Sequence, residues 1–327
     1  EKIDQAKLPS TKLLFSPRVG FNWDITGDRS TQLRGGTGIF TGRVPFVWIG
    51  NVISNPGSNP NLYGPFNPTG QRISTSGEGI PQQSFDLNAA DPDFKWPQVW
   101  TTNLAVDHQL PGGLLGTLEV LYGKDINAVF VRNADLQPRV RTLPDGRPYY
   151  KDSTGNTQLN RGQFGDDGGI YVIDNTSDGY NLSVALQLRK RFDFGLNASL
   201  GYAYLTAKNN MQSTEIASVL WSGNPVQGNP NKPELSFSQF GIRNRITASA
   251  SYKHSWSEQW ATSFGLFLEV AEGNRFAGSG GNRYSFTYAG DVNGDGQGGN
   301  DLIYIPRDQS DIVFVQNGSV TPAEQRT

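Results

Sequence analysis

Polar and apolar residues alternate along most of the chain, which is the pattern of β-strands with one apolar and one polar face. The clearest stretch runs from Tyr180 to Phe192. Every second residue on its apolar face is large: Tyr180, Leu182, Val184, Leu186 and Leu188. The intervening positions are polar or small. A second alternating stretch, 194–204, follows a short link at Asp193, so the two stretches predict an antiparallel hairpin.

The same pairing recurs along the chain and predicts eight long strands. We expect them near residues 17–25, 31–41, 98–109, 114–124, 179–192, 194–207, 241–254 and 259–271. Strands of about ten residues are long enough to cross a membrane at a tilt. Strands of ordinary globular domains are shorter, at about five or six residues.

The links between these strands are alternately short and long. The short links lie near residues 26–30, 110–113, 193 and 255–258, and the long ones at 42–97, 125–178, 208–240 and 272–327. Outer-membrane barrels have this arrangement, with short periplasmic turns and long extracellular loops. The sequence therefore predicts an all-β fold, an antiparallel transmembrane β-barrel segment with long extracellular loops. A soluble β-sandwich is the alternative fold, because its strands alternate too.

Composition and charge exclude several other classes. The 327 residues carry a net charge of -2 and include no cysteine. Disulfide scaffolds and thiolate metal sites are therefore excluded, and no basic excess favours nucleic-acid binding. No apolar run approaches the roughly 18 residues of a membrane-spanning helix, and no signal peptide opens the sequence.

The predicted topology places both ends of the chain on the long-loop side. The first strand leads into a short turn, and the last strand leads into a long link. Both ends of a barrel inserted from the periplasm normally lie inside the cell envelope. We therefore expect the sequence to be an excerpt of a larger barrel, cut within external loops.

Three segments carry a family resemblance. Residues 15–21 read F-S-P-R-V-G-F, and residues 33–45 read L-R-G-G-T-G-I-F-T-G-R-V-P. These resemble the mid-barrel strand pair of TonB-dependent outer-membrane receptors, particularly the Oar-like group. Residues 291–306, from D-V-N-G-D-G to N-D-L-I-Y-I-P, resemble a late external loop of that group.

This resemblance implies a barrel of about 22 strands in the outer membrane of a Gram-negative bacterium. It implies a receptor that binds a substrate with its external loops and passes it through a plugged barrel. Its partners would be outer-membrane lipid and a TonB-type energising complex that acts through a plug domain absent from this sequence. The substrate is not fixed by the resemblance. A passive porin-like channel and a soluble secreted adhesin or carbohydrate-binding module are the alternative functions.

A calcium-loop motif lies near the end of the chain. Asp291, Asn293, Asp295 and Gly296 spell D-x-N-x-D-G, which directs oxygen ligands toward one hard cation. The twelfth position, where an EF-hand has glutamate, is Leu302, so we expect Asp301 to replace that ligand. A simple Asp/Gly turn without metal is the alternative.

Charged and aromatic residues supply candidate substrate contacts. Strand parity directs five charged residues to the barrel interior: Arg189, Arg243, Arg245, Lys253 and Glu269. They would hold a polar substrate, or alternatively pair with each other or contact a plug. The predicted loops contain nine aromatic residues: Phe46, Trp48, Tyr63, Phe66, Trp96, Tyr149, Tyr150, Trp221 and Tyr284. They would stack on a substrate, especially Trp48 and Trp221, or alternatively pack the loops together.

Enzymatic chemistry has no support in the sequence. The glycines at 294, 296 and 299 match a dinucleotide fingerprint but lack the strand and helix that such a site requires. The two histidines, His108 and His254, lie near predicted periplasmic turns, away from the loops. We therefore expect the protein not to be an enzyme.

Overall fold

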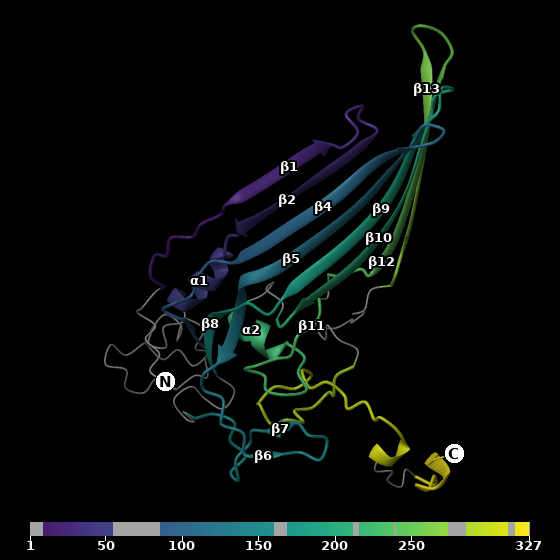
Figure 1. Ribbon diagram of the computed structural model, residues 1–327. Coiled ribbons are helices and arrows are strands. Elements are labelled where there is room, and N and C mark those ends of the chain that lie inside the picture. Colours follow the sequence, from purple (N-terminus) through teal and green to yellow (C-terminus); the bar gives the residue numbers. More distant parts are fainter. Residues whose placement is uncertain are drawn as a thin grey trace, which may run out of the picture.

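Eight long strands form one antiparallel sheet in the computed structural model (Figure 1). The structure describes residues 9–54, 86–159, 169–211, 216–238, 240–273, 286–312 and 318–326. The strands lie side by side in chain order: β1 (Arg18–Asp24), β2 (Thr31–Thr41), β4 (Gln98–Leu110), β5 (Leu114–Asn133), β9 (Tyr180–Arg191), β10 (Leu196–Asn209), β12 (Asn244–Ser255) and β13 (Ala261–Ala271). Each long strand is antiparallel to the next one along the chain, so the sheet is a meander whose connections are alternately short turns and long loops.

Most of these bounds differ by one to three residues from the predicted ranges, and β5 is the exception. It was expected to end near 124, but it continues to Asn133. The predicted end is wrong because the alternation continues through Val129 and Val131, whose side chains are buried beneath the loops. Gly123, Asp125 and Asn127 favour a turn in the sequence, but the strand continues past them.

The register gives the sheet one apolar and one polar face. One row of directly paired residues is Leu33, Val106, Leu118, Leu186, Tyr202, Ile246 and Val270. The adjacent row is Gln32, Asp107, Thr117, Gln187, Gly201, Thr247 and Glu269. Directly paired residues point to the same side, and adjacent rows point to opposite sides. We refer to these two sides as the apolar face and the polar face. Many large side chains of the apolar face are exposed, among them Leu118, Leu186 and Leu200.

Short elements between the strands form a layer at one end of the sheet (Figure 1). They include α1 (Phe46–Ser54), β3 (Leu87–Ala90), β6 (Arg141–Thr142), β7 (Pro148–Tyr149), β8 (Ile170–Thr176), α2 (Ala217–Ser222), β11 (Ser236–Phe237), η2 (Gln309–Asp311) and η3 (Glu324–Arg326). We call α1, β3, β6, β7, β8, α2 and β11, together with residues 286–304, the loop layer. The long links thus contain short helices and strands, and their place outside the membrane stays a prediction.

The loop layer has its own hydrophobic core. β3 pairs in parallel with β8, and β8 pairs with the extended end of β5. Buried residues from α1, β5, β8 and α2 pack together, including Trp48, Val131, Ile173 and Trp221. This packing explains why β5 extends beyond its predicted end: its last residues belong to the loop layer and no longer to the main sheet.

At the opposite end, the strands are joined by tight turns. Gly112 and Gly113 between β4 and β5 have φ angles of 78° and 74°, a conformation that glycine adopts without steric cost. None of the helices in the described part of the chain combines the length and the apolar character that crossing a membrane requires. Within the same residues β1 and β13 form the two edges of the sheet, which is open, so the expected count of about 22 strands stays a prediction.

Candidate functional site

A cluster of charged side chains lies on the polar face across β2, β4 and β5. The Arg34 guanidinium donates to Asp107 Oδ2 from Nε at 2.9 Å and to Glu119 Oε2 from Nη2 at 3.3 Å. Thr117 Oγ1 donates to Asp107 Oδ1 at 2.6 Å, and Asn103 Nδ2 donates to Glu119 Oε1 at 3.3 Å. Sequence analysis did not single out this cluster. The pattern that could have revealed the cluster is the presence of opposite charges at polar-face positions of neighbouring strands.

Two of the predicted interior residues are brought together on the same face. Arg245 Nε lies 3.0 Å from Glu269 Oε1, and both side chains are partly exposed. Arg243 lies just before β12, and its guanidinium stands 5.1 Å from the centre of the Phe237 ring. Arg245 and Glu269 therefore satisfy each other's charge, while Arg243 lies apart from them. Substrate binding by these three residues stays a prediction.

The two predicted tryptophans lie in the core of the loop layer. Trp48 is 3% exposed, and Trp221 is 1% exposed. Trp221 Nε1 donates to Asn231 Oδ1 at 2.8 Å, and its ring packs on Tyr171 with centres 5.7 Å apart. This burial agrees with the packing alternative for Trp221, and direct substrate contact by either tryptophan stays a prediction.

The other loop aromatics divide into exposed and buried residues. Phe46 is 89% exposed and Trp96 is 44% exposed, whereas Tyr150 is buried. Tyr149 stacks with Arg141, whose guanidinium lies 4.4 Å from the ring centre. Three further aromatic candidates, Tyr63, Phe66 and Tyr284, lie outside the described residues.

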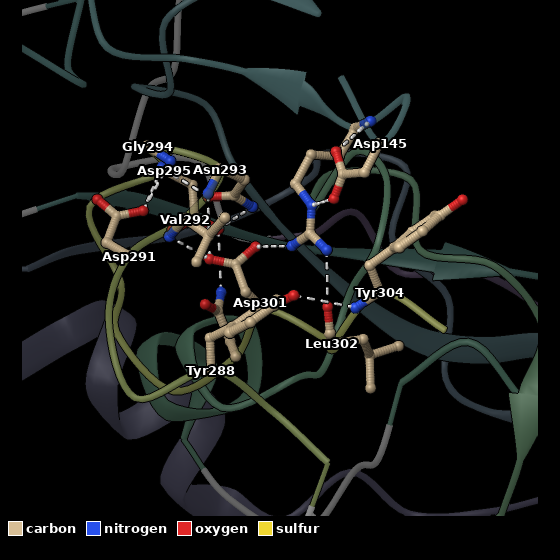
Figure 2. A network of polar contacts seen from close by, with 12 residues as sticks. Asp145, Tyr288, Asp291, Val292, Asn293, Gly294, Asp295, Asp301, Leu302 and Tyr304 are labelled. Atoms are coloured by element: carbon tan, nitrogen blue, oxygen red, sulfur yellow. Dashed lines mark hydrogen bonds and ion pairs between the residues drawn. The ribbon is translucent and has the colours of Figure 1, made fainter. Parts of the chain in front are cut away.

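Residues 291–301 form a compact, largely buried loop (Figure 2). The Asp291 carboxylate accepts hydrogen bonds from the backbone N–H groups of Gly294, Asp295 and Gly296 at 2.7 Å, 3.1 Å and 3.2 Å. Gly294 and Gly296 have positive φ angles, of 74° and 90°. The glycines therefore allow the chain to fold around one carboxylate, as the D-x-N-x-D-G pattern predicts.

Asp301 closes this loop and joins it to another one. Its Oδ2 accepts from the backbone N–H groups of Val292 and Asn293 at 2.7 Å and 3.2 Å. Its Oδ1 accepts from Arg147 Nη1 at 3.1 Å (Figure 2). Arg147 also donates to Asp145 Oδ2 at 2.6 Å and to the Leu302 carbonyl at 2.8 Å. A buried guanidinium thus connects the loop between β5 and β8 with residues 301–302.

Further contacts hold residues 291–301 in place. The backbone N–H of Tyr150 donates to the Asn293 carbonyl at 2.9 Å, and Lys151 Nζ lies 2.7 Å from Asp291 Oδ2. The backbone N–H of Val226 donates to the Asn300 carbonyl at 2.9 Å. The segment therefore contacts both other long links that contribute to the loop layer at this point, 125–178 and 208–240.

Burial changes the acidity of this loop. The pKa of Asp295 rises from its usual 3.8 to about 6 because the carboxyl is buried, although hydrogen bonds from Asn300, Asn293 and Gln297 oppose the rise. Burial also raises the pKa of Asp301, opposed by the backbone donors of Val292 and Asn293. The hydrogen bond with Asp291 raises the pKa of Lys151. Burial therefore brings the pKa of Asp295, at about 6, close to neutral pH.

The predicted calcium ligands lie in one loop, but their carboxylates already have partners. Asp291 pairs with Lys151, and Asp301 pairs with Arg147. Asp295 Oδ2 accepts from Asn293 Nδ2 at 3.1 Å and from Asn300 Nδ2 at 2.9 Å. Across the described ranges, no three His, Cys, Asp or Glu side chains converge as metal ligands. Calcium binding stays a prediction.

Two cavities flank Trp48. The first, of about 200 Å³, is mainly apolar and is lined by residues such as Val52, Phe94 and Trp96. The second, of about 400 Å³, lies between the ends of β2, β4, β5 and β10, and charged and amide side chains contribute to its lining. The second cavity is thus open to a ligand with both polar and apolar groups.

The two histidines lie at the turn end of the sheet. His108 Nδ1 is 2.8 Å from Thr31 Oγ1, and the His254 ring packs edge-on against Trp256 with centres 4.2 Å apart. Both are far along their strands from the loop layer, because β4 and β12 join that layer at their other ends.

These observations describe a sheet with an exposed apolar face, an ion-paired polar face and an ordered layer of long loops. A sequence profile described as "Outer membrane beta barrel domain" matches residues 2–321. The chain belongs to this outer-membrane β-barrel family. The protein therefore resides in the outer membrane of a Gram-negative bacterium, and the soluble β-sandwich alternative is wrong. The apolar face is the lipid-facing side.

Solved structures similar to this outer-membrane barrel chain include three bacterial proteins. The outer membrane transporter YddB from Escherichia coli is 14% identical, with a TM-score of 0.43, over 79% of this chain and 29% of that chain. The siderophore receptor PirA from Pseudomonas aeruginosa is 11% identical, with a TM-score of 0.36, over 78% of this chain and 33% of that chain. A mutant of the ferric enterobactin receptor PfeA from the same species is 11% identical, with a TM-score of 0.34, over 72% of this chain and 27% of that chain. The chain spans a third or less of the length of these proteins. No curated protein sequence matches it.

Proposed function

We propose that the protein is a TonB-dependent outer-membrane receptor of the Oar-like group, which takes a substrate into its extracellular loop layer and passes it through a plugged barrel. The observation that carries this proposal is the ordered loop layer at one end of an ion-paired polar wall. Three long links share contacts there through Arg147, Tyr150 and Val226. A preformed loop layer is suited to selective capture of a substrate, since little ordering cost accompanies binding.

The polar wall supports the same proposal. Arg34, Asp107 and Glu119 form an ion-paired cluster on the polar face, with part of each side chain still exposed. Such a surface can form hydrogen bonds with a plug domain or with a hydrated substrate inside the barrel. The energising partner would be a TonB-type complex acting on the plug from the periplasm. We propose no catalytic role for any residue.

A conductance measurement on the protein purified from outer membranes tests the proposal. A plugged receptor inserted in a planar bilayer is expected to show no steady conductance until the plug is loosened with urea. A steady conductance in the absence of urea would overturn the proposal in favour of a passive porin-like channel. The intact mass of the same preparation provides a second check. A plugged receptor of about 22 strands is expected to have about two to three times the mass of these 327 residues.

A further inference from the structure

The larger cavity beside Trp48 contains a carboxylate to which no residue in the described part of the chain donates a hydrogen bond. Asp125 lines this cavity of about 400 Å³ together with Asn127 and Asn209. No side chain or backbone N–H of the described ranges donates to the Asp125 carboxylate. The adjacent Lys124 turns elsewhere, since its Nζ donates to the Asp178 carbonyl at 2.9 Å. The carboxylate is partly buried and faces the cavity, so its free oxygens can accept hydrogen bonds from a ligand that takes the place of water.

The backbone places Asp125 at a junction in the fold. The register of β4 and β5 shifts between Gln98 and Val99, with Gln98 opposite Asn127 and Val99 opposite Asp125. Ile126 is thus an extra residue in β5, which is the arrangement of a β-bulge. β5 pairs with β9 up to Lys124 and with β8 from Ala128. The three residues from Asp125 to Asn127 therefore lie where β5 passes from the barrel wall into the loop layer.

The neighbouring chain makes room for this carboxylate. Asp125 Oδ2 lies directly against Gly179, so closely that a Cβ atom at position 179 would collide with it. The backbone N–H of Asp125 donates to the Gly179 carbonyl at 2.9 Å, which fixes the strand at this point. The backbone thus fixes the strand at Asp125, and the missing side chain of Gly179 leaves room for the carboxylate.

The remaining lining defines the chemistry of a ligand. Asn127 Nδ2 donates to Gln98 Oε1 at 3.1 Å, which leaves Asn127 Oδ1 as an acceptor. Trp48, Phe40 and Met211 supply apolar surface. A carboxylate and an amide acceptor beside an apolar wall suit a group with several N–H donors on an apolar body.

We propose that this cavity binds a primary ammonium group carried by a peptide, either a lysine side chain or a free amino terminus next to an apolar residue. The ammonium donates to Asp125 and Asn127, and the apolar part packs against Trp48 and Phe40. Arg43 lines the same cavity and is exposed, so it contacts the carboxyl or carbonyl end of the peptide. This inference rests on the proposed function, because it names the class of substrate that the receptor would capture.

Calorimetry on the protein purified in detergent from outer membranes tests this inference. The probe is the dipeptide amide lysyl-phenylalanine amide, and its matched control is the same compound acetylated on both amino groups. We expect the free amine to bind and the acetylated compound not to bind. Asp125→Asn keeps the shape of the side chain and is expected to weaken binding at least ten-fold. Glu258→Gln removes the same charge at an exposed turn on the opposite end of the sheet and is expected to leave binding unchanged.

Three outcomes would overturn the inference: absence of amine binding, equal binding of the acetylated compound, or unchanged binding by Asp125→Asn. Binding of a neutral sugar probe, maltotriose, with the same dependence on Asp125 would also overturn the ammonium assignment. Heat-modifiable mobility on a gel shows that each variant is folded. The conductance measurement separates this inference from the proposed function. If the protein binds the amine but conducts without urea, only the transporter proposal is wrong. If the protein does not conduct and does not bind the amine, only the present inference is wrong.

Discussion

Arg147 Nη1 lies 3.1 Å from Asp301 Oδ1, and both side chains are fully buried. The two residues are 154 positions apart in the sequence. A buried ion pair of this kind gives little net stability compared with an apolar pair, but removal of one partner leaves an uncompensated charge. The pair therefore makes the fold of residues 291–301 dependent on the loop between β5 and β8.

Removal of the guanidinium is expected to loosen the loop layer. We expect Arg147→Met to destabilise this layer by about 3–5 kcal/mol, because Asp301 would remain buried without its cation. Hydrogen exchange of peptides that cover residues 286–304 is the measurement. Arg307→Met is the matched control, since Arg307 also pairs with an aspartate, Asp311, but its side chain is 83% exposed. Equal exchange rates in Arg147→Met and the parent protein would show that the buried pair does not hold the loop.

The stability of the same loop is expected to depend on pH through Asp295. The pKa of this carboxyl is raised from 3.8 to about 6 in the folded loop, because burial disfavours its charged form. Folding therefore favours the protonated form of Asp295. The contribution of this group to the stability of the loop is complete below pH 3.8 and is lost as the pH rises through 6. A shift of this size corresponds to about 3 kcal/mol. Hydrogen exchange of residues 286–304 between pH 4 and 7 checks this, and Asp295→Asn should remove the dependence. A parent protein whose exchange, corrected for intrinsic rates, is the same at both ends of this range would contradict it.

Calcium is expected to stabilise the 291–301 loop if it displaces the amide donors around Asp295. Asn300 Oδ1 is buried, and no described residue donates to it, so one oxygen is available next to Asp295 Oδ2. The ion must compete with Lys151 for Asp291 and with Arg147 for Asp301. We expect millimolar Ca²⁺ to raise the thermal midpoint of the parent protein and a chelator to lower it. Asp295→Ala should abolish both effects, and Asp193→Asn at a distant turn should keep them. No response of the parent protein to chelation would leave the loop as an Asp/Gly turn.

The two faces of the sheet are expected to tolerate charge very differently. Leu200 lies on the apolar face of β10, and the adjacent Ser199 lies on the polar face, where its Oγ is 2.7 Å from Ser249 Oγ. Leu200→Arg is expected to destabilise the barrel by about 2–4 kcal/mol, because the charge would enter the hydrocarbon of the membrane. Ser199→Arg should have a much smaller effect. Unfolding by urea in lipid vesicles measures both, and equal effects would mean that the faces are assigned incorrectly.

The wall of this barrel could be predicted from sequence because its signal is local. Alternation from Tyr180 to Leu188 defines both faces of β9 without knowledge of any partner strand. The loop layer could not be predicted in this way. Trp48 and Trp221 are buried because segments far apart in the chain pack over them. The periodicity of α1 and α2 does not predict that contact. The parallel pairing of β3 with β8 is equally invisible, since it joins four-residue stretches more than eighty positions apart.

The candidate sites show the same division. The turn formed by Asp291 and its glycines follows from a motif that acts within six residues. The partners of that loop, Arg147 and Lys151, come from a different part of the chain and are visible only in the structure. The Arg34–Asp107–Glu119 cluster required the register of three strands, which sequence spacing alone does not provide.

β5 connects the wall of the barrel mechanically with the loop layer. This one strand is hydrogen-bonded to β9 within the membrane wall and to β8 within the loop layer. A tilt of the loop layer relative to the wall must therefore bend the backbone between Lys124 and Ala128. That short stretch adjoins the cavity that Asp125 lines, so we expect a ligand in the cavity to change the angle between the loop layer and the wall. The effect of such a ligand would then reach the wall along the backbone of β5 itself.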